Sequence, residues 1–224
     1  MLITAYTRRM KRLFLILMSF VLAAFVSCSR VEPRILFGFM EKTYFWEDDG
    51  LQKQYSFFIL SEDDDGIENL AELQLFHDRE GLRWLFTADD WVLFEDGGRN
   101  WIGSRNIAMH DGANLPRGQF RAVLINKGGE RTERLFSFDV PEDSPHPFPA
   151  FLIDDGLFRL DSAYPVNRLL VYNEQGDVIQ TVPLVQEAGN FSDLNLSGNA
   201  IGVSLWAEDP LYRISALTEV AALR

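Results

Sequence analysis

An acidic stretch in the first third of the chain carries the residue types that bind calcium. Asp63, Asp65 and Glu72 stand at positions 3, 5 and 12 of a window that begins at Ser61 and has a glycine at position 6. Calcium takes six to eight oxygen ligands, and carboxylates at this spacing supply them. Serine replaces the usual aspartate at position 1, so a solvated acidic loop between two strands is the alternative. Apart from such a structural Ca²⁺, no cofactor is predicted.

Three histidines are the remaining candidates for acid–base chemistry or metal binding. His77 and His110 each precede an aspartate, and His146 lies among prolines. Their spacing is not that of a zinc site, and a single cysteine excludes a cysteine-based site. The sequence has no nucleophile-elbow, phosphate-loop or dinucleotide motif. We therefore predict no catalytic residue and no enzyme; an envelope hydrolase would require a concave pocket with converging polar groups.

Three tryptophans lie close together in the sequence, at Trp84, Trp91 and Trp101, with Phe86 and Phe94 among them. Aromatic rings on a β-surface can stack against a sugar or seat a peptide. They can equally form the core, because aromatic side chains contribute the largest burial terms. The three tryptophans are thus candidate ligand-binding residues, with core packing as the alternative.

The N-terminal segment has the layout of a secretory signal. Four basic residues between Arg8 and Arg12 precede the fourteen-residue apolar run from Leu13 to Val26. Such a run fits the apolar region of a signal peptide and is short for a membrane-spanning helix. Met10 is an alternative start to Met1, since it begins a complete short signal by itself.

The end of this run resembles the lipobox of bacterial lipoproteins, with Ser27 before Cys28, the only cysteine in the chain. Phe25 replaces the leucine that the lipobox prefers, and relaxed boxes of this kind resemble those of spirochaetal lipoproteins of uncharacterised role. The resemblance implies cleavage before Cys28 and attachment of acyl chains such as palmitate. Two acyl chains give stable membrane anchoring. The expected location is extracytoplasmic, at the outer membrane or the periplasmic face of the cell envelope.

The charge balance excludes nucleic acid as a partner. The chain has 21 basic and 33 acidic residues, a formal net charge of −12. Removal of the signal would take away four basic residues and no acidic one, so the mature protein would be still more acidic. Binding to phosphate backbones requires a basic surface.

The body of the chain reads as β-structure. Short apolar stretches alternate with Gly, Asp, Asn and Pro, and no segment sustains a helical period for more than about two turns. Ile67–Phe76 is an alternative helical turn, and 216–224 is predicted as a brief helix. The expected strands are Ile35–Met40, Gln54–Leu60, Glu72–His77, Leu82–Thr87, Trp91–Phe94, Trp101–Gly103, Ile107–Met109, Gln119–Asn126, Thr132–Val140, Leu169–Tyr172, Val178–Leu184, Ala200–Trp206 and Leu211–Ser215.

The stretch from Gly118 to Phe138 resembles the last hairpin of immunoglobulin-like and fibronectin type III domains. Phe120 stands in place of the corner tyrosine, and Ala122 in place of the cysteine of the inter-sheet disulfide. Period-2 alternation predicts that Phe120, Ala122 and Leu124 point inward. The resemblance implies an immunoglobulin-like or fibronectin type III-like β-sandwich.

The expected fold class is all-β, with this sandwich followed by a smaller second β-domain and preceded by a cleaved lipoprotein signal peptide. Four prolines within residues 140–149 mark a semi-rigid boundary. The predicted division is a signal peptide (1–27), a lipidated tether (28–34), the sandwich (35–140), a Pro-rich linker (141–149) and a small β-domain (150–224).

These features predict a lipid-anchored envelope protein that acts as a non-enzymatic interaction or structural module. Its partners would be the membrane, through Cys28, and a protein or glycan of the envelope. The alternative is a carbohydrate- or peptide-binding lipoprotein that uses the aromatic face around Trp84, Trp91 and Trp101.

Overall fold

The computed structural model describes residues 31–47, 50–110 and 112–223. Within these ranges the chain forms sixteen β-strands, three short 3₁₀ helices and no α-helix, which confirms the all-β class. Among the same residues, no helix has the length and apolarity needed to cross a membrane. The predicted signal peptide and Cys28 lie outside the described residues.

A mixed nine-stranded sheet contains strands from both halves of the chain. Its order is β12-β11-β14-β15-β1-β2-β6-β5, with β16 paired to β14. Every pair is antiparallel except β1 with β15. The strands are β1 (Arg34–Glu47), β2 (Gly50–Glu62), β5 (Val92–Asp96), β6 (Arg99–Ile107), β11 (Val166–Tyr172), β12 (Val178–Pro183), β14 (Gly202–Asp209), β15 (Ile214–Leu217) and β16 (Ala221–Ala222).

A four-stranded antiparallel sheet packs against one end of the large sheet, in the order β4-β3-β7-β8. Its inner face carries Leu73, Leu75, Phe120 and Leu124, all without solvent exposure. They pack in one core with residues of β1, β2 and β6, so this half is a β-sandwich. The strands are β3 (Leu70–His77), β4 (Leu82–Thr87), β7 (Gly118–Asn126) and β8 (Arg131–Phe138), and the 3₁₀ helices η1 (Ile67–Asn69) and η2 (Asp78–Glu80) flank β3.

A three-stranded sheet packs against the other end, in the order β13-β10-β9. Phe158 and Leu160 of β10 belong to the same buried cluster as Leu169 and Leu205 of the large sheet. Residues 141–149, the predicted linker, form no strand or helix. The elements are β9 (Ala150–Asp154), β10 (Leu157–Asp161), β13 (Ala188–Asn190) and η3 (Phe191–Leu194).

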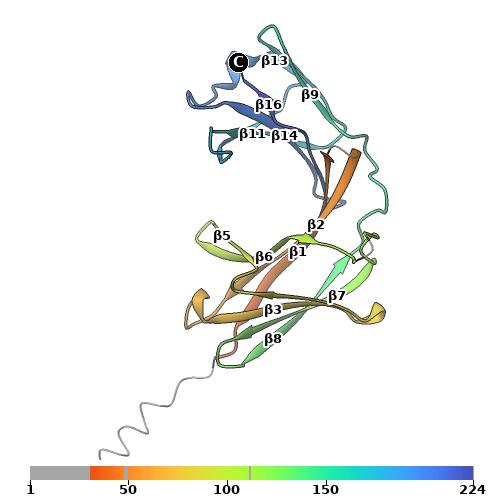
Figure 1. Cartoon of the computed structure of the whole chain (residues 1–224), viewed down its shortest axis with the longest axis vertical. Coiled ribbons are helices and arrows are strands. Elements are labelled where there is room, and N and C mark those ends of the chain that lie inside the picture. The colour runs from red at the N-terminus through yellow and green to blue at the C-terminus, as the bar shows by residue number, and fades with distance from the viewer. Residues whose placement is uncertain (1–30, 48–49, 111, 224) are drawn as a thin grey trace, which may run out of the picture.

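The large sheet is curled, and Figure 1 shows its two ends bending toward the same side. The four-stranded and three-stranded sheets lie on the outside of the curl (Figure 1). The four-stranded sheet therefore covers one end of the outer, convex face and the three-stranded sheet covers the other end. Neither sheet covers the inner face. We call this inner surface the concave face.

Strand β1 is longer than the sequence predicts and connects the two halves. The prediction ended at Met40, but the strand continues to Glu47, and Lys42–Phe45 pair in parallel with Ile214–Leu217 of β15. Segments 35–140 and 150–224 consequently share one sheet. Their division into two domains stays a prediction.

The predicted β7–β8 hairpin is confirmed, in a register that joins Gly118 to Phe138 and Ile125 to Arg131. Phe120, Ala122 and Leu124 point inward as expected. The helical alternative at Ile67–Phe76 is wrong beyond the short turn η1, because β3 pairs on both sides. The predicted C-terminal helix is also wrong: Ala216 is buried in β15, and β16 follows.

Candidate functional site

An aromatic group occupies the concave face at the end formed by β1, β2, β6 and β5. The register places Phe37, Trp101 and Phe94 in one row across these strands, and Phe39 beside Phe58 in the next. Cross-strand partners share a face of a sheet. These five residues, which we call the aromatic patch, face away from the four-stranded sheet. Phe37 is 52% exposed, although it lies within a strand.

The rings of the aromatic patch pack mainly against one another. Trp101 and Phe94 form a parallel stack with centroids 6.1 Å apart and 4° between their planes. Phe37 and Phe39 meet Trp101 edge to face at 6.1 and 5.5 Å. One face of the indole is therefore used within the patch. What the patch offers to solvent is apolar surface around Phe37.

A polar strip follows the aromatic patch toward β15, β14 and β11. Glu41 and Thr43 continue the concave face of β1, and the Thr43 and Ser215 hydroxyls lie 2.9 Å apart. Ser215 pairs with Glu208, whose Oε2 accepts a hydrogen bond of 2.8 Å from Arg168 Nη1. We call these five residues the polar strip. It holds two carboxylates and one guanidinium.

Glu41 is the unusual member of the polar strip. Its Oε1 is buried and has no hydrogen-bond partner among the described residues. Burial raises the pKa of the Glu41 carboxyl, a hydrogen bond with Ser215 lowers it in part, and the neighbouring Glu208 raises it further. A buried carboxylate with an unsatisfied oxygen is costly in free energy.

Replacement of Glu41 by glutamine is expected to stabilise the protein at neutral pH by about 0.5–2 kcal/mol, because the amide keeps the shape of the side chain but has no negative charge to bury. Because the folded pKa is raised, the folded state holds the proton more tightly than the unfolded state. The contribution of Glu41 to stability is therefore greatest below its unfolded pKa of about 4.3 and is lost as pH rises through the folded pKa. The advantage of the variant should shrink as pH falls toward 4.

Urea unfolding at pH 4 to 7.5 measures this difference. Glu68→Gln is the control, since Glu68 is exposed and its substitution should leave the profile unchanged. A Glu41→Gln protein less stable than its parent at pH 7 would contradict a strained carboxylate.

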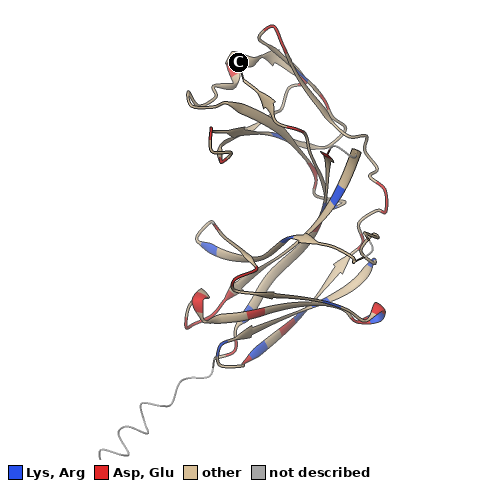
Figure 2. Cartoon of the chain, in the orientation of Figure 1, with Lys and Arg blue, Asp and Glu red and all other residues tan. Residues whose placement is uncertain are grey.

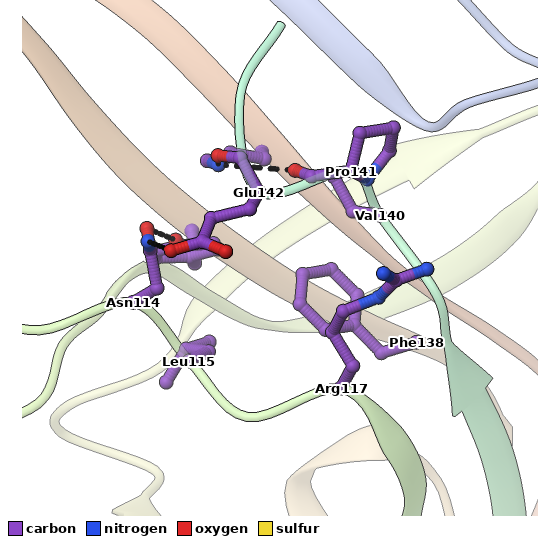
Figure 3. A pocket seen from close by; sticks show the side chains of 9 residues that line it. Asn114, Leu115, Arg117, Phe138, Val140, Pro141 and Glu142 are labelled. Carbon is purple, nitrogen blue, oxygen red and sulfur yellow. Dashed lines mark hydrogen bonds between the residues drawn. The ribbon is translucent and has the colours of Figure 1, made fainter.

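Lys42, the neighbour of Glu41, lies on the opposite face of β1. It is 1% exposed, and its Nζ donates to the carbonyl oxygens of Pro141, at 3.2 Å, and Glu142. Burial and the charge of Lys53 lower the pKa of its amine, while Asp143 and Glu142 act in the other direction. Lys42 lines a cavity of about 200 Å³, shown in Figure 3.

The predicted ligand-binding tryptophans do not share a face. Trp101 belongs to the aromatic patch. Trp84 pairs with Leu75, which is fully buried, and thus points into the sandwich, where its ring lies 6.1 Å from Phe120 and its Nε1 donates to the Ala108 carbonyl at 3.0 Å. Trp91 packs partly buried against the core. The ligand-binding role of the three residues stays a prediction.

Two of the three predicted calcium ligands, Asp63 and Glu72, accept hydrogen bonds within the protein. Asp63 accepts hydrogen bonds from the Asp65 amide at 2.9 Å and from Asn69 Nδ2 at 3.2 Å. Glu72 accepts one from Gln74 at 2.7 Å. In the part of the chain that the structure describes, no three His, Cys, Asp or Glu residues gather as a metal site. Asp63, Asp65 and Glu72 are therefore not brought together as a ligand set.

The three histidines have different surroundings. His77 is buried against the ring of Phe120, with Nε2 3.3 Å from the Arg117 carbonyl. His110 is exposed, and its aspartate neighbour lies outside the described residues. His146 Nε2 lies 2.7 Å from Asp209 Oδ2 and holds the linker against β14.

Several residues of the concave face are not predicted as site residues from the sequence. Phe37, Phe39 and Glu41 alternate with residues of the opposite face, which is a signal in the sequence. The alternation shows that two faces exist, but it does not tell which one another sheet will cover. The members of the polar strip on β11, β14 and β15 join Glu41 only through the β1–β15 pairing.

Comparison with known proteins assigns no family. No family model matches the chain, and no curated protein matches it significantly. Among solved structures, the chain is similar to dimeric latent PorU from Porphyromonas gingivalis, with 12% identity and a TM-score of 0.34. The match covers 87% of this chain and 20% of that one, so this chain spans about a fifth of the PorU chain. A TM-score of this size is too low to assign a function.

Proposed function

We propose that the protein is a non-enzymatic interaction module, held in the cell envelope by acyl chains on Cys28, that binds an extended segment of a protein partner on its concave face. The observation that carries this proposal is the aromatic patch on the face that neither smaller sheet covers. The partner segment would place apolar side chains on the aromatic patch and a basic side chain on the polar strip.

The ring geometry favours a protein segment over the alternative, a glycan. Sugar binding uses the open face of an aromatic ring, but Phe94 lies parallel to one face of Trp101 and Phe39 packs on the indole as well. Phe37 instead offers exposed apolar surface of the kind that aliphatic side chains bury.

The charge of the face supports a basic residue in the partner. Glu41 and Glu208 lie in the polar strip with Arg168 as the one cation, and the side chains of Glu208 and Arg168 are 27% and 41% exposed. The whole chain is acidic, and Figure 2 shows acidic residues concentrated at turns. Such a distribution steers a basic partner toward the protein.

Calorimetric titration with synthetic peptides tests whether the concave face binds an extended segment. The probe is a peptide of alternating leucine and lysine of about ten residues, near the upper length of a strand. We expect it to bind more tightly than matched Ser/Lys and Leu/Glu peptides, and a linear glucan oligosaccharide should not bind. Phe37→Ser should weaken binding at least about tenfold, because loss of an aromatic anchor costs about 2 kcal/mol or more.

Leu135→Ser is the matched control, since Leu135 is 54% exposed but lies on the outer four-stranded sheet. It should leave the affinity unchanged. Equal effects of the two variants would show non-specific adhesion and overturn the proposal. Binding of the oligosaccharide in place of the peptide would favour the glycan-binding alternative.

The tether is tested separately, in cells. Metabolic labelling with palmitate should label the protein, and Cys28→Ser should abolish the label and release the protein from the membrane fraction. An unlabelled parent, or a mature N-terminus other than Cys28, would contradict the proposed lipid anchor. It would leave the proposed binding face untouched.

A further inference from the structure

Lys42 is a buried cation without a counter-ion among the described residues. Its Nζ bonds to two carbonyl oxygens and lies 5.1 and 5.7 Å from the ring centroids of Tyr44 and Tyr55. In the described part of the chain, no carboxylate lies within ion-pair distance of it. Carbonyl dipoles and rings compensate only part of the cost of burying a full charge.

The cavity next to Lys42 has the size and lining for a small molecule. It measures about 200 Å³. Leu115, Phe138 and Val140 form its apolar wall, and each is at most 3% exposed. Tyr55 and Asn114 supply polar groups, and their side chains hydrogen-bond to each other at 2.7 Å. An apolar wall opposite a buried cation suits a ligand with a hydrocarbon part and a negative group.

The charges around the cavity favour an anion. Arg117 lies on its rim and donates to the Asp139 carbonyl at 3.4 Å, with no ion pair among the described residues. Lys53 donates to Asn114 at 2.7 Å. The one carboxylate in the lining, Glu142, is turned toward Asn114, and the Arg117 side chain passes over Phe138 (Figure 3). Although Asp143 is close enough to act on Lys42, the cations outnumber the carboxylates here in a protein that is acidic overall.

We infer that this cavity binds a small organic carboxylate, whose negative group Lys42 holds and whose hydrocarbon part lies against Leu115, Phe138 and Val140, while Arg117 adds positive charge at the rim. The ligand supplies the counter-charge that Lys42 lacks. The site lies on the other side of β1 from the concave face, because successive side chains of a strand point to opposite faces. It does not depend on the proposed binding of a partner segment.

Calorimetric titration with sodium propionate tests the inference, with propionamide as the neutral molecule of the same shape and sodium chloride at matched ionic strength. We expect propionate to bind with a Kd of about 1 mM, as suits so small a ligand, and to raise the melting temperature. Propionamide and chloride should do neither.

Two variants test whether propionate binds in this cavity. Lys42→Met should abolish binding of propionate. Arg117→Gln should weaken it about threefold, since it removes one positive charge from the rim of the cavity. Arg117 is exposed, so this variant decides the question if Lys42→Met fails to fold. Lys127→Gln, at an exposed turn, is the control and should bind like the parent.

Three results would overturn the inference: no heat of binding with propionate, equal binding of propionamide, or unchanged affinity in Arg117→Gln. Propionate should also leave the affinity for the Leu/Lys peptide unchanged, which separates a failure of this site from a failure of the concave face.

Discussion

Gly103→Ala is expected to abolish folding or to reduce the free energy of unfolding by more than about 4 kcal/mol, beyond the range of most single substitutions. A Cβ atom at this position would lie 1.9 Å from the carbonyl oxygen of Phe57 and 2.8 Å from the Cα of Phe58. Both atoms belong to the backbone of β2, so no side-chain rotation relieves the clash. Strand β6 would have to move away from β2.

The position of Gly103 makes this movement costly. It pairs with Phe58 on β2 and with Val92 on β5, in the row of the aromatic patch that holds Phe39 and Phe58. Displacement of β6 would break these pairs and separate Phe58 from Phe94, whose ring centroids lie 5.2 Å apart. The substitution should therefore remove the binding face together with the fold.

Soluble yield, circular dichroism and urea unfolding measure the effect. Gly198→Ala is the control, because a Cβ there meets nothing within 4 Å and the backbone angle is ordinary. It should change stability by less than about 0.5 kcal/mol. A Gly103→Ala protein that unfolds at the parent's urea midpoint would show that β2 and β6 do not approach so closely.

Phe120→Ala has the second largest expected effect, a loss of about 3–5 kcal/mol. The side chain is completely buried in the sandwich. Its ring lies 4.7 Å from His77 and 5.9 Å from Phe138, where it meets the second ring at 90°. The truncation would leave a cavity between the two sheets and expose the polar ring of His77 to it.

Urea unfolding followed by near-ultraviolet circular dichroism measures this loss. Leu135→Ala on β8 is the matched control, since Leu135 is 54% exposed and its truncation should cost less than about 0.5 kcal/mol. A cost below 1 kcal/mol for Phe120→Ala would mean that the sandwich core does not close around this ring.

Phe120 and Gly103 lie in parts of the fold that differ in how far the sequence predicts them. Phe120 was expected to point inward, because apolar residues recur at every second position from 120 to 124 and glycines mark the following turn. The sequence predicts a strand at Gly103, but nothing in it indicates that β2 approaches the backbone of Gly103 so closely. Such an approach depends on how two strands, distant in sequence, pack.

Strand β1 shows why the candidate site was only partly predictable. Its apolar run ends at Met40, and the adjacent Glu41 and Lys42 resemble the start of a turn. They remain in the strand because β2 pairs on one side and β15 on the other, and because Lys42 finds carbonyl partners in the linker. Their place in the strand thus depends on distant segments, and local patterns do not report distant segments.

The amino-acid sequence by itself determined that this chain folds as strands, where most of them lie, and which side chains of β7 share a face. Those properties follow from alternation and turn residues, which act over a few positions. Only the tertiary structure decided that β1 joins β15, that the large sheet curls, and that the face bearing Phe37 and Trp101 is the uncovered one. Backbone hydrogen bonds are the same for every strand, so the choice of partner and of the covered face rests on packing between residues far apart in the chain.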